Sequence, residues 1–279
     1  MNLLVTTEWL AAELGKTDIR VIDATTFLAA HGRNARAEFE TAHIPGAVFF
    51  DIDEVADLTS PLPHMLPPAE KFASRMQALG LGDGSRIVVY DNSPLKSAAR
   101  VWWMLMLFGA HEVSILDGGF AKWQAEGRHL ESGKPVVRHR HFTVWADKAL
   151  VRDAKAMTEN LRTRAEQVVD ARSAGRFAGT EPEPRAGLRG GHIPGSKNVP
   201  FDTLFNEDGT YKSADAIKTL FADAGIDLAK PVVATCGSGI TAAVLTFGAA
   251  MAGHTKMALY DGSWSEWGAN QHNPVVTGA

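Results

Sequence analysis

The chain contains one cysteine, Cys236, within the stretch VVATCGSGITAAV (residues 232–244). A β-branched run precedes it, and a glycine- and serine-rich loop separates it from a helix-like segment. The backbone N–H groups of such a loop can form a concave nest, and the N-terminal end of the following helix adds a positive dipole. This setting favours the thiolate, which is the nucleophilic form of cysteine. A buried, unreactive cysteine is the alternative interpretation, but the Gly-Ser-Gly context favours the nucleophile.

The composition is that of a soluble globular protein with room for two domains. The chain has 279 residues, of which 45% are hydrophobic and 22% are charged, and its formal net charge is −4. No block of like charges indicates binding to nucleic acid or to a membrane. One cysteine allows neither an internal disulfide nor a cysteine-based metal site, which favours a reducing, cytoplasmic location. The N-terminus lacks a signal-peptide pattern, and the longest apolar run (residues 101–110) is too short to cross a bilayer.

An internal repeat determines the domain organisation. The stretch AHIPGAVFFDID (residues 42–53) returns as GHIPGSKNVPFD (residues 191–202), and ILDGGFAKW (residues 115–123) returns as LYDGSWSEW (residues 259–267). Two shorter pairs, VIDA with VVDA and IVVYD with VVATC, occur in the same order at nearly the same spacing. A nearly constant offset predicts two tandem copies of one domain.

Each copy is predicted to be an α/β domain. In both copies, β-branched runs alternate with longer helical patterns, which predicts a mostly parallel sheet with helices on both faces. The domains are placed at residues 1–135 and 151–279, with a linker at residues 136–150. Ligands gather at the carboxyl ends of the strands in such sheets, so Cys236 is expected at that edge. The first copy has Asp91 at the matching position, so only the second copy is expected to be catalytic.

These features resemble the two-domain rhodanese-type sulfurtransferases over essentially the whole chain. The resemblance rests on the motifs HIPGA and HIPGS, DGG and DGS, and the loop CGSGIT at residues 236–241. The neutral loop is similar to that of family members that use 3-mercaptopyruvate, whereas members that use thiosulfate carry a basic CRKGVT-like loop. Thiosulfate is a dianion that benefits from cationic loop side chains, while the single carboxylate of mercaptopyruvate can be bound elsewhere. The loop residues predicted to bind substrate are Gly237, Gly239, Ile240 and Thr241.

Two arginines complete the substrate site that the resemblance implies. Arg176 in AGRF and Arg185 in PEPR are expected to bind the carboxylate and carbonyl of the donor, because a planar guanidinium matches a carboxylate. The first copy has no PEPR segment, which supports a substrate role for this insertion. The neighbouring Arg172 and Arg189 are predicted to be structural.

The first half of the sequence is expected to contribute to proton handling. By resemblance, Asp53 of the DID stretch and His64 of PHMLP act with Ser238 in the logic of a Ser-His-Asp array. Ser238 would donate a hydrogen bond or relay a proton, and is not the nucleophile. His43 and His192, in the repeated HIPG motif, are predicted to be structural because they occur in both copies.

The reaction implied by the resemblance is a double displacement. The Cys236 thiolate takes the sulfur of 3-mercaptopyruvate and releases pyruvate, and the resulting persulfide passes its outer sulfur to cyanide, a small thiol or reduced thioredoxin. No metal or organic cofactor is expected, and no nucleic-acid or membrane partner.

Three alternative functions compete with this interpretation. A cysteine phosphatase would need an arginine six positions after the cysteine, where this chain has Ala242. A thiosulfate sulfurtransferase remains an alternative enzyme. A non-catalytic persulfide carrier or redox sensor remains an alternative of another class.

Overall fold

The computed structural model describes residues 1–278, which form two compact units. The first unit consists of Met1–Leu58, Leu66–Asp147 and Asn206–Tyr211, and therefore includes most of the segment interpreted as a linker. The second unit consists of Thr59–Met65, Lys148–Phe205 and the chain from Lys212 onward. Each unit thus takes one short segment from the other half of the sequence.

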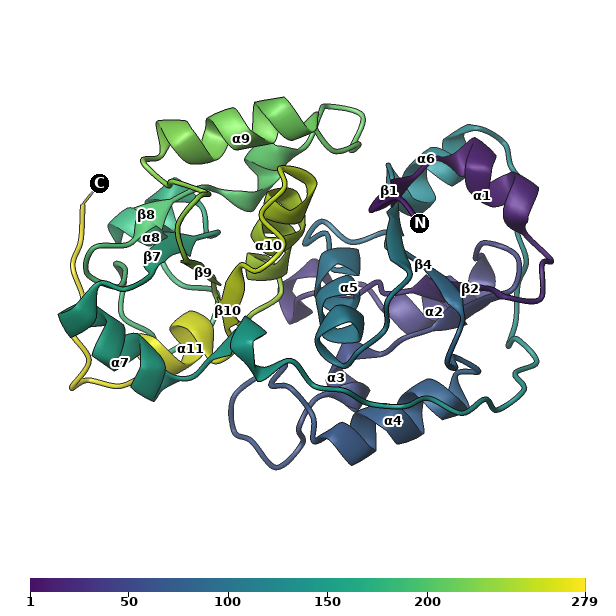
Figure 1. The fold of residues 1–279 in the computed structure, drawn as a ribbon, viewed down its shortest axis with the longest axis horizontal. Helices are drawn as coiled ribbons and strands as arrows, with labels where there is room; N and C mark the ends of the chain where they lie inside the picture. The colour runs from purple at the N-terminus through teal and green to yellow at the C-terminus, as the bar shows by residue number, and fades with distance from the viewer. Residues whose placement is uncertain (279) are drawn as a thin grey trace. The chain divides into compact units, whose positions relative to one another are not determined.

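The first unit is built on a five-stranded parallel sheet (Figure 1). Its strands, in spatial order, are β1 (Leu4–Val5), β5 (Val113–Leu116), β4 (Arg86–Tyr90), β2 (Ile19–Asp23) and β3 (Ala47–Phe49). Its helices are α1 (Thr7–Glu13), η1 (Ala29–His31), α2 (Ala35–Thr41), α3 (Ile52–Val55), α4 (Ala69–Ala78), α5 (Ala98–Leu107) and α6 (Gly119–Ala125).

The second unit repeats this architecture with the same strand order. Its strands, in spatial order, are β6 (Val151–Arg152), β10 (Ala258–Tyr260), β9 (Val232–Thr235), β7 (Gln167–Asp170) and β8 (Lys197–Asn198). Its helices are η2 (Lys148–Leu150), α7 (Ala154–Thr163), α8 (Ala174–Ala178), η3 (Phe201–Leu204), α9 (Ala214–Asp223), α10 (Ala242–Met251) and α11 (Ser263–Trp267).

The prediction of two tandem α/β domains with parallel sheets is therefore confirmed. The central strands, β4 and β9, are mostly apolar and buried because helices cover both faces of each sheet. In the second unit, α10 packs against β9, β10 and α9, and α7 lies beside α11 (Figure 1). Met157, Trp264 and Trp267 from α7 and α11 form an apolar cluster with the sheet. This packing holds β9, the strand that leads into the cysteine loop, rigidly in the core.

No helix within residues 1–278 is both long enough and apolar enough to cross a membrane.

A buried carboxylate at the end of β2 makes the stability of the first unit depend on pH. Burial raises the pKa of Asp23 to about 6, although hydrogen bonds from Thr25 oppose the shift. The matching Asp170 in the second unit is paired with Arg172, where the first unit has Thr25. The stabilisation that comes from protonating Asp23 is complete below about pH 3.8 and is lost as the pH rises through about 6.

Asp23→Asn is therefore expected to stabilise the protein at pH 7.5 by on the order of 2 kcal/mol, because it removes a buried charge. The Asn carbonyl can still accept the 2.8 Å bond from the Thr25 N–H. Urea unfolding at pH 7.5 and pH 4.5 measures the effect, and the advantage should shrink at the lower pH. An advantage of equal size at both pH values would contradict the role of ionisation.

Candidate active site

Cys236 lies directly after the central strand β9 and ahead of α10, at the carboxyl edge of the second sheet. Cys236 is only 1% exposed, so its thiol lies at the bottom of the loop rather than on the surface. The start of α11 holds the loop from one side. The Trp264 N–H donates to the Cys236 carbonyl at 2.9 Å, and both the N–H and the hydroxyl of Ser265 donate to the Gly237 carbonyl. The backbone at the nucleophile is therefore fixed by neighbouring structure.

Ser263 is one residue at this site that was not foreseen from the sequence. Its Oγ accepts a hydrogen bond from the Cys236 N–H at 3.2 Å and donates one to the Tyr260 carbonyl at 2.8 Å. It is fully buried and adopts a left-handed backbone conformation, with φ of 48°. The first unit has Gly119 at the matching position, with φ of 58°. A residue with a side chain adopts this conformation only at an energetic cost. Because Ser263 also holds the backbone of Cys236, we interpret it as a positioning residue.

Two substitutions of Ser263 separate backbone strain from hydrogen bonding. Ser263→Ala keeps the strained conformation and loses both hydrogen bonds, whereas Ser263→Gly loses the bonds but relieves the strain. We expect Ser263→Ala to have a lower free energy of unfolding than Ser263→Gly, by about 1 kcal/mol. Denaturant unfolding of both variants provides the measurement. Equal stabilities would show that the left-handed conformation carries no cost here.

The cysteine loop contains backbone N–H groups that are available to bind an anion. Four of its N–H groups donate no hydrogen bond to any residue among 1–278: those of Gly237, Ser238, Ile240 and Thr241. All four residues are buried. Gly239, between them, has φ of 80°, which the loop's tight path requires of a glycine. Buried, unpaired N–H groups beside a sulfur atom stabilise an anion there, since their desolvation is otherwise uncompensated.

The first unit shows the same loop position occupied by an acidic side chain. Asp91 replaces the cysteine, and its carboxylate accepts hydrogen bonds from the N–H groups of Ser93 at 3.0 Å and Ala98 at 2.7 Å. Burial raises the pKa of Asp91, and these two bonds oppose the shift. Ser93 matches Ser238 in the repeat, and the Asp91 carbonyl accepts from Phe120 just as Cys236 accepts from Trp264. The N–H groups of this loop are therefore placed to donate hydrogen bonds to an acidic group at this position.

The predicted partners Ser238 and His64 lie together in the second unit. The Nδ1 atom of His64 is hydrogen-bonded to Oγ of Ser238 at 3.0 Å, and His64 has a left-handed φ of 60°. The segment Thr59–Met65 belongs to the second unit, although it lies in the first half of the sequence. Asp53 lies in α3 of the first unit, and its action on His64 stays a prediction.

Arg176 lies beside the cysteine loop and is held by Glu183. A Cβ atom at Gly237 would lie 2.9 Å from Nη2 of Arg176, so glycine is needed for the guanidinium to pack there. Nη2 and Nε of Arg176 donate to the carboxylate of Glu183 at 2.6 and 3.2 Å. The same carboxylate accepts from Arg172 at 2.8 Å, and Arg172 is also paired with Asp170 at 2.6 Å. Glu183 was not foreseen from the sequence, although it is the acidic residue two positions before Arg185.

The structural roles predicted for the other basic residues are confirmed by their contacts. Arg172 is fully buried in its ion pairs and lies over the ring of Trp264, at 4.2 Å from the centroid. Arg189 donates to four carbonyls near the C-terminus: those of Trp267, Gly268, Asn270 and Asn273. His43 and His192 each bond a backbone carbonyl through Nδ1 and stack on a phenylalanine ring. Arg185, by contrast, is a half-buried residue whose role stays a prediction.

Comparison with known proteins gives consistent matches along the chain. A model of the rhodanese-like domain matches residues 6–126 and 152–270. The 3-mercaptopyruvate sulfurtransferase of Mus musculus is 47% identical over 270 residues, covering 95% of this chain and 91% of that protein. The thiosulfate sulfurtransferase of Cricetulus griseus is 42% identical, with 95% and 91% coverage. The crystal structure of the 3-mercaptopyruvate sulfurtransferase SseA from Escherichia coli matches with a TM-score of 0.86 at 40% identity, covering 95% of this chain and 100% of that one.

Proposed function

The chain belongs to the rhodanese-like domain family, and from this premise we propose that it is a 3-mercaptopyruvate sulfurtransferase. It would move sulfur from 3-mercaptopyruvate to a thiol or cyanide acceptor through a persulfide on Cys236, with release of pyruvate. One observation carries the proposal: the thiol lies in a loop of unpaired N–H groups, with a guanidinium packed on the neighbouring Gly237. A nucleophile and an anion-binding side chain thus meet at one point.

The loop and its sulfur account for the transfer step. The Cys236 thiolate attacks the sulfur of the donor, and the bond between that sulfur and the donor's C3 breaks. The electron pair of the broken bond stays with carbon as the enolate of pyruvate, which takes up a proton. The unpaired N–H groups of the loop stabilise the negative charge of the persulfide that remains. An acceptor nucleophile then attacks the outer sulfur and restores the thiolate.

The donor's carboxylate would be held by Arg176 and Arg185. Arg176 offers its remaining Nη1 edge, because Nε and Nη2 already contact Glu183. Asp170 and Glu183 balance the charges of Arg172 and Arg176, so this buried group carries no net positive charge. Arg185 would then supply a second guanidinium for the anionic donor.

Ser238 and His64 would handle the proton that the enolate requires. Their 3.0 Å contact supports a relay in which Ser238 lies nearer the donor and Asp53 acts through His64. Ser238→Ala and His64→Ala are each expected to lower kcat about 10²-fold, and the double variant should fall little further, because the two side chains act as one unit. Steady-state kinetics of the three variants provides the test. Multiplicative losses in the double variant would show that the residues act independently.

Thiosulfate is the second candidate donor, since a thiosulfate sulfurtransferase is among the relatives at 42% identity. The neutral CGSGIT loop favours mercaptopyruvate, because it offers no cationic side chain to a dianion. Acceptors would be cyanide, a small thiol or a thioredoxin-like protein. A cytoplasmic location is inferred from the single unpaired cysteine, which a reducing compartment keeps functional.

Mass spectrometry of the intact protein tests the proposal directly. After incubation with 3-mercaptopyruvate and no acceptor, the protein should gain one sulfur atom at Cys236 and release one equivalent of pyruvate. Addition of cyanide should remove that sulfur as thiocyanate. A protein that gains no sulfur and releases no pyruvate would contradict the enzyme and leave a binding or redox-sensing module.

A further inference from the structure

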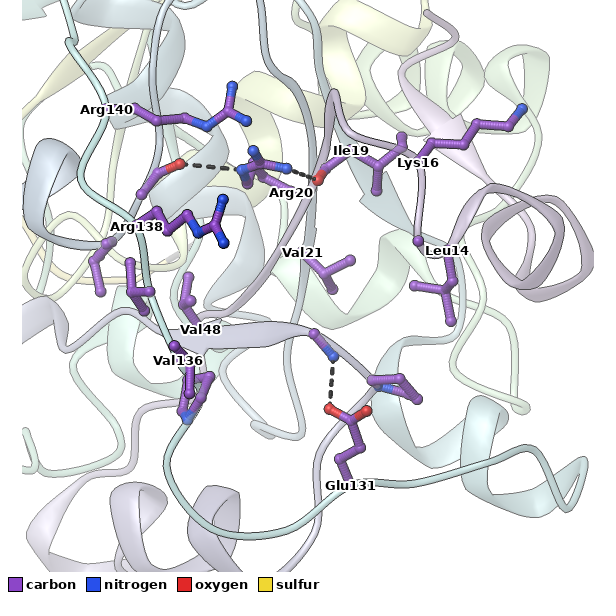
Figure 2. A pocket seen from close by; sticks show the side chains of 17 residues that line it. Leu14, Lys16, Ile19, Arg20, Val21, Val48, Glu131, Val136, Arg138 and Arg140 are labelled. Atoms are coloured by element: carbon purple, nitrogen blue, oxygen red, sulfur yellow. Dashed lines mark hydrogen bonds between the residues drawn. The ribbon is translucent and has the colours of Figure 1, made fainter.

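A second candidate binding site lies in the first unit, at the amino end of its sheet. A cavity of about 470 Å³ opens beside the start of β2 and beneath residues 135–140 (Figure 2). This volume falls in the range of small-molecule sites. One part of its wall is apolar, formed by Leu14, Val21, Val48, Leu79, Val136 and Val137. The cavity therefore offers room and apolar contact at the opposite end of the strands from the loop of Asp91.

Three guanidinium groups gather on another part of the wall. Figure 2 shows those of Arg20, Arg138 and Arg140 next to one another. Arg20 is fixed: its Nε donates to the Gly80 carbonyl at 3.1 Å, and its Nη1 donates to the Ile19 carbonyl. Arg140 donates to the Thr17 carbonyl at 3.2 Å. Hydrogen bonds to backbone carbonyls thus hold Arg20 and Arg140 in place, and Arg138 lines the same cavity.

No carboxylate in the described part of the chain forms an ion pair with these three arginines. Asp18 forms an ion pair with Arg86 at 2.7 Å, and Glu131 accepts a hydrogen bond from the Gly46 N–H at the far end of the cavity. Arg138 makes neither a hydrogen bond nor an ion pair through its side chain within residues 1–278. Burial and the nearby charge of Arg140 lower the pKa of Arg20, and the charge of Asp18 opposes them. A bound anion would relieve the repulsion between Arg20 and Arg140 that remains.

The duplicated fold provides an internal comparison. The second unit has a cavity of about 510 Å³ in the matching place, lined by Pro194, Gly195 and Gly225 where the first has Pro45, Gly46 and Gly80. Gln167 takes the place of Arg20 there, and it exchanges two 2.8 Å hydrogen bonds with the backbone of Asp227. The fold therefore accommodates a neutral side chain at this position. The arginine cluster is a feature of the first unit that the architecture does not require.

We propose that this cavity binds a small organic phosphate, with the phosphate on Arg20, Arg138 and Arg140 and the organic part against the apolar wall. Three clustered guanidiniums match a dianion better than a monocarboxylate, and their forks suit phosphate oxygens. The apolar wall distinguishes a phosphate monoester from free phosphate. The site is separate from Cys236 and does not depend on the proposed sulfur transfer.

Isothermal titration of the full chain with phenyl phosphate tests the site. Wild type should bind one equivalent in the cavity, at least about tenfold more tightly than inorganic phosphate. Arg20→Gln installs the residue of the second unit and should weaken binding about tenfold or more. Arg138→Ala should weaken binding too, and it provides a second variant that removes no contact of the fold.

Two controls locate the binding. Arg164→Asn alters the matching cavity in the second unit, and Arg176→Ala alters the candidate active site, so both should retain wild-type affinity for phenyl phosphate. Absence of saturable binding to wild type would overturn the proposal. Wild-type affinity for phenyl phosphate in both Arg20→Gln and Arg138→Ala would also overturn it. Loss of binding in Arg176→Ala alone would overturn it as well.

Discussion

Replacing Cys236 by serine is expected to lower kcat/KM for 3-mercaptopyruvate by at least about 10³-fold, because it removes the nucleophile that carries the transferred sulfur. The fold should persist. The backbone bonds that fix the loop run through the carbonyl and N–H of Cys236 and not through its side chain. Serine is also close to cysteine in size, so no large cavity forms. Pyruvate release and the gain of one sulfur, both measured on purified protein, should be lost together.

Asp91→Asn provides a matched control in the first unit. Asp91 occupies the same loop position as Cys236, and its carboxylate accepts from the N–H groups of Ser93 and Ala98. The substitution alters the same structural position in the copy without a thiol, so turnover per folded molecule should stay close to wild type. Substantial turnover in Cys236→Ser would show that another group accepts the sulfur. A loss as large in Asp91→Asn would show that loop packing, and not the thiol, controls the rate.

The tandem fold could be predicted from the sequence because its signals are local. Strands β2, β4, β7 and β9 are short segments rich in β-branched residues, and paired motifs such as HIPG mark equivalent turns in the two copies. The position of Cys236 at the carboxyl end of a central strand follows from the same pattern. The link between His64 and Ser238 joins residues 174 positions apart, and only the family resemblance indicated it.

The supporting residues of the site could not be predicted because their roles depend on tertiary contacts. Ser263 looked like one residue of a DGS turn, and its left-handed conformation and bond to Cys236 arise only when α11 packs against the loop. The substitution of Ser263 for the first copy's Gly119 was the available signal. In the sequence, Glu183 is one of three charged residues in the stretch EPEPR (residues 181–185), and only its contacts in the fold show that it joins Arg172 to Arg176. The burial that raises the pKa of Asp23 likewise depends on the assembled sheet.

The link through Glu183 determines what the loss of Arg176 should do. Arg176→Ala is expected to raise KM for 3-mercaptopyruvate about 10- to 100-fold, because it removes a charge-assisted contact to the donor carboxylate. It also leaves the side chain of Glu183, which is only 2% exposed, with Arg172 as its partner. KM for thiosulfate should rise less, since that donor has no carboxylate for the site to orient. Initial rates with each donor, with cyanide as the common acceptor, give the increase in KM for 3-mercaptopyruvate relative to that for thiosulfate.

Arg162→Ala is the control, because Arg162 is exposed and, within residues 1–278, pairs only with Glu159 on its own helix. Arg162→Ala should leave KM unchanged for both donors. Arg185→Ala, like Arg176→Ala, should raise KM more for 3-mercaptopyruvate than for thiosulfate. Equal increases in KM for both donors in Arg176→Ala would mean that the guanidinium supports the loop through Gly237 rather than binding the carboxylate. A selective increase would place donor recognition on Arg176 itself, since the packing contact with Gly237 is the same whichever donor is bound.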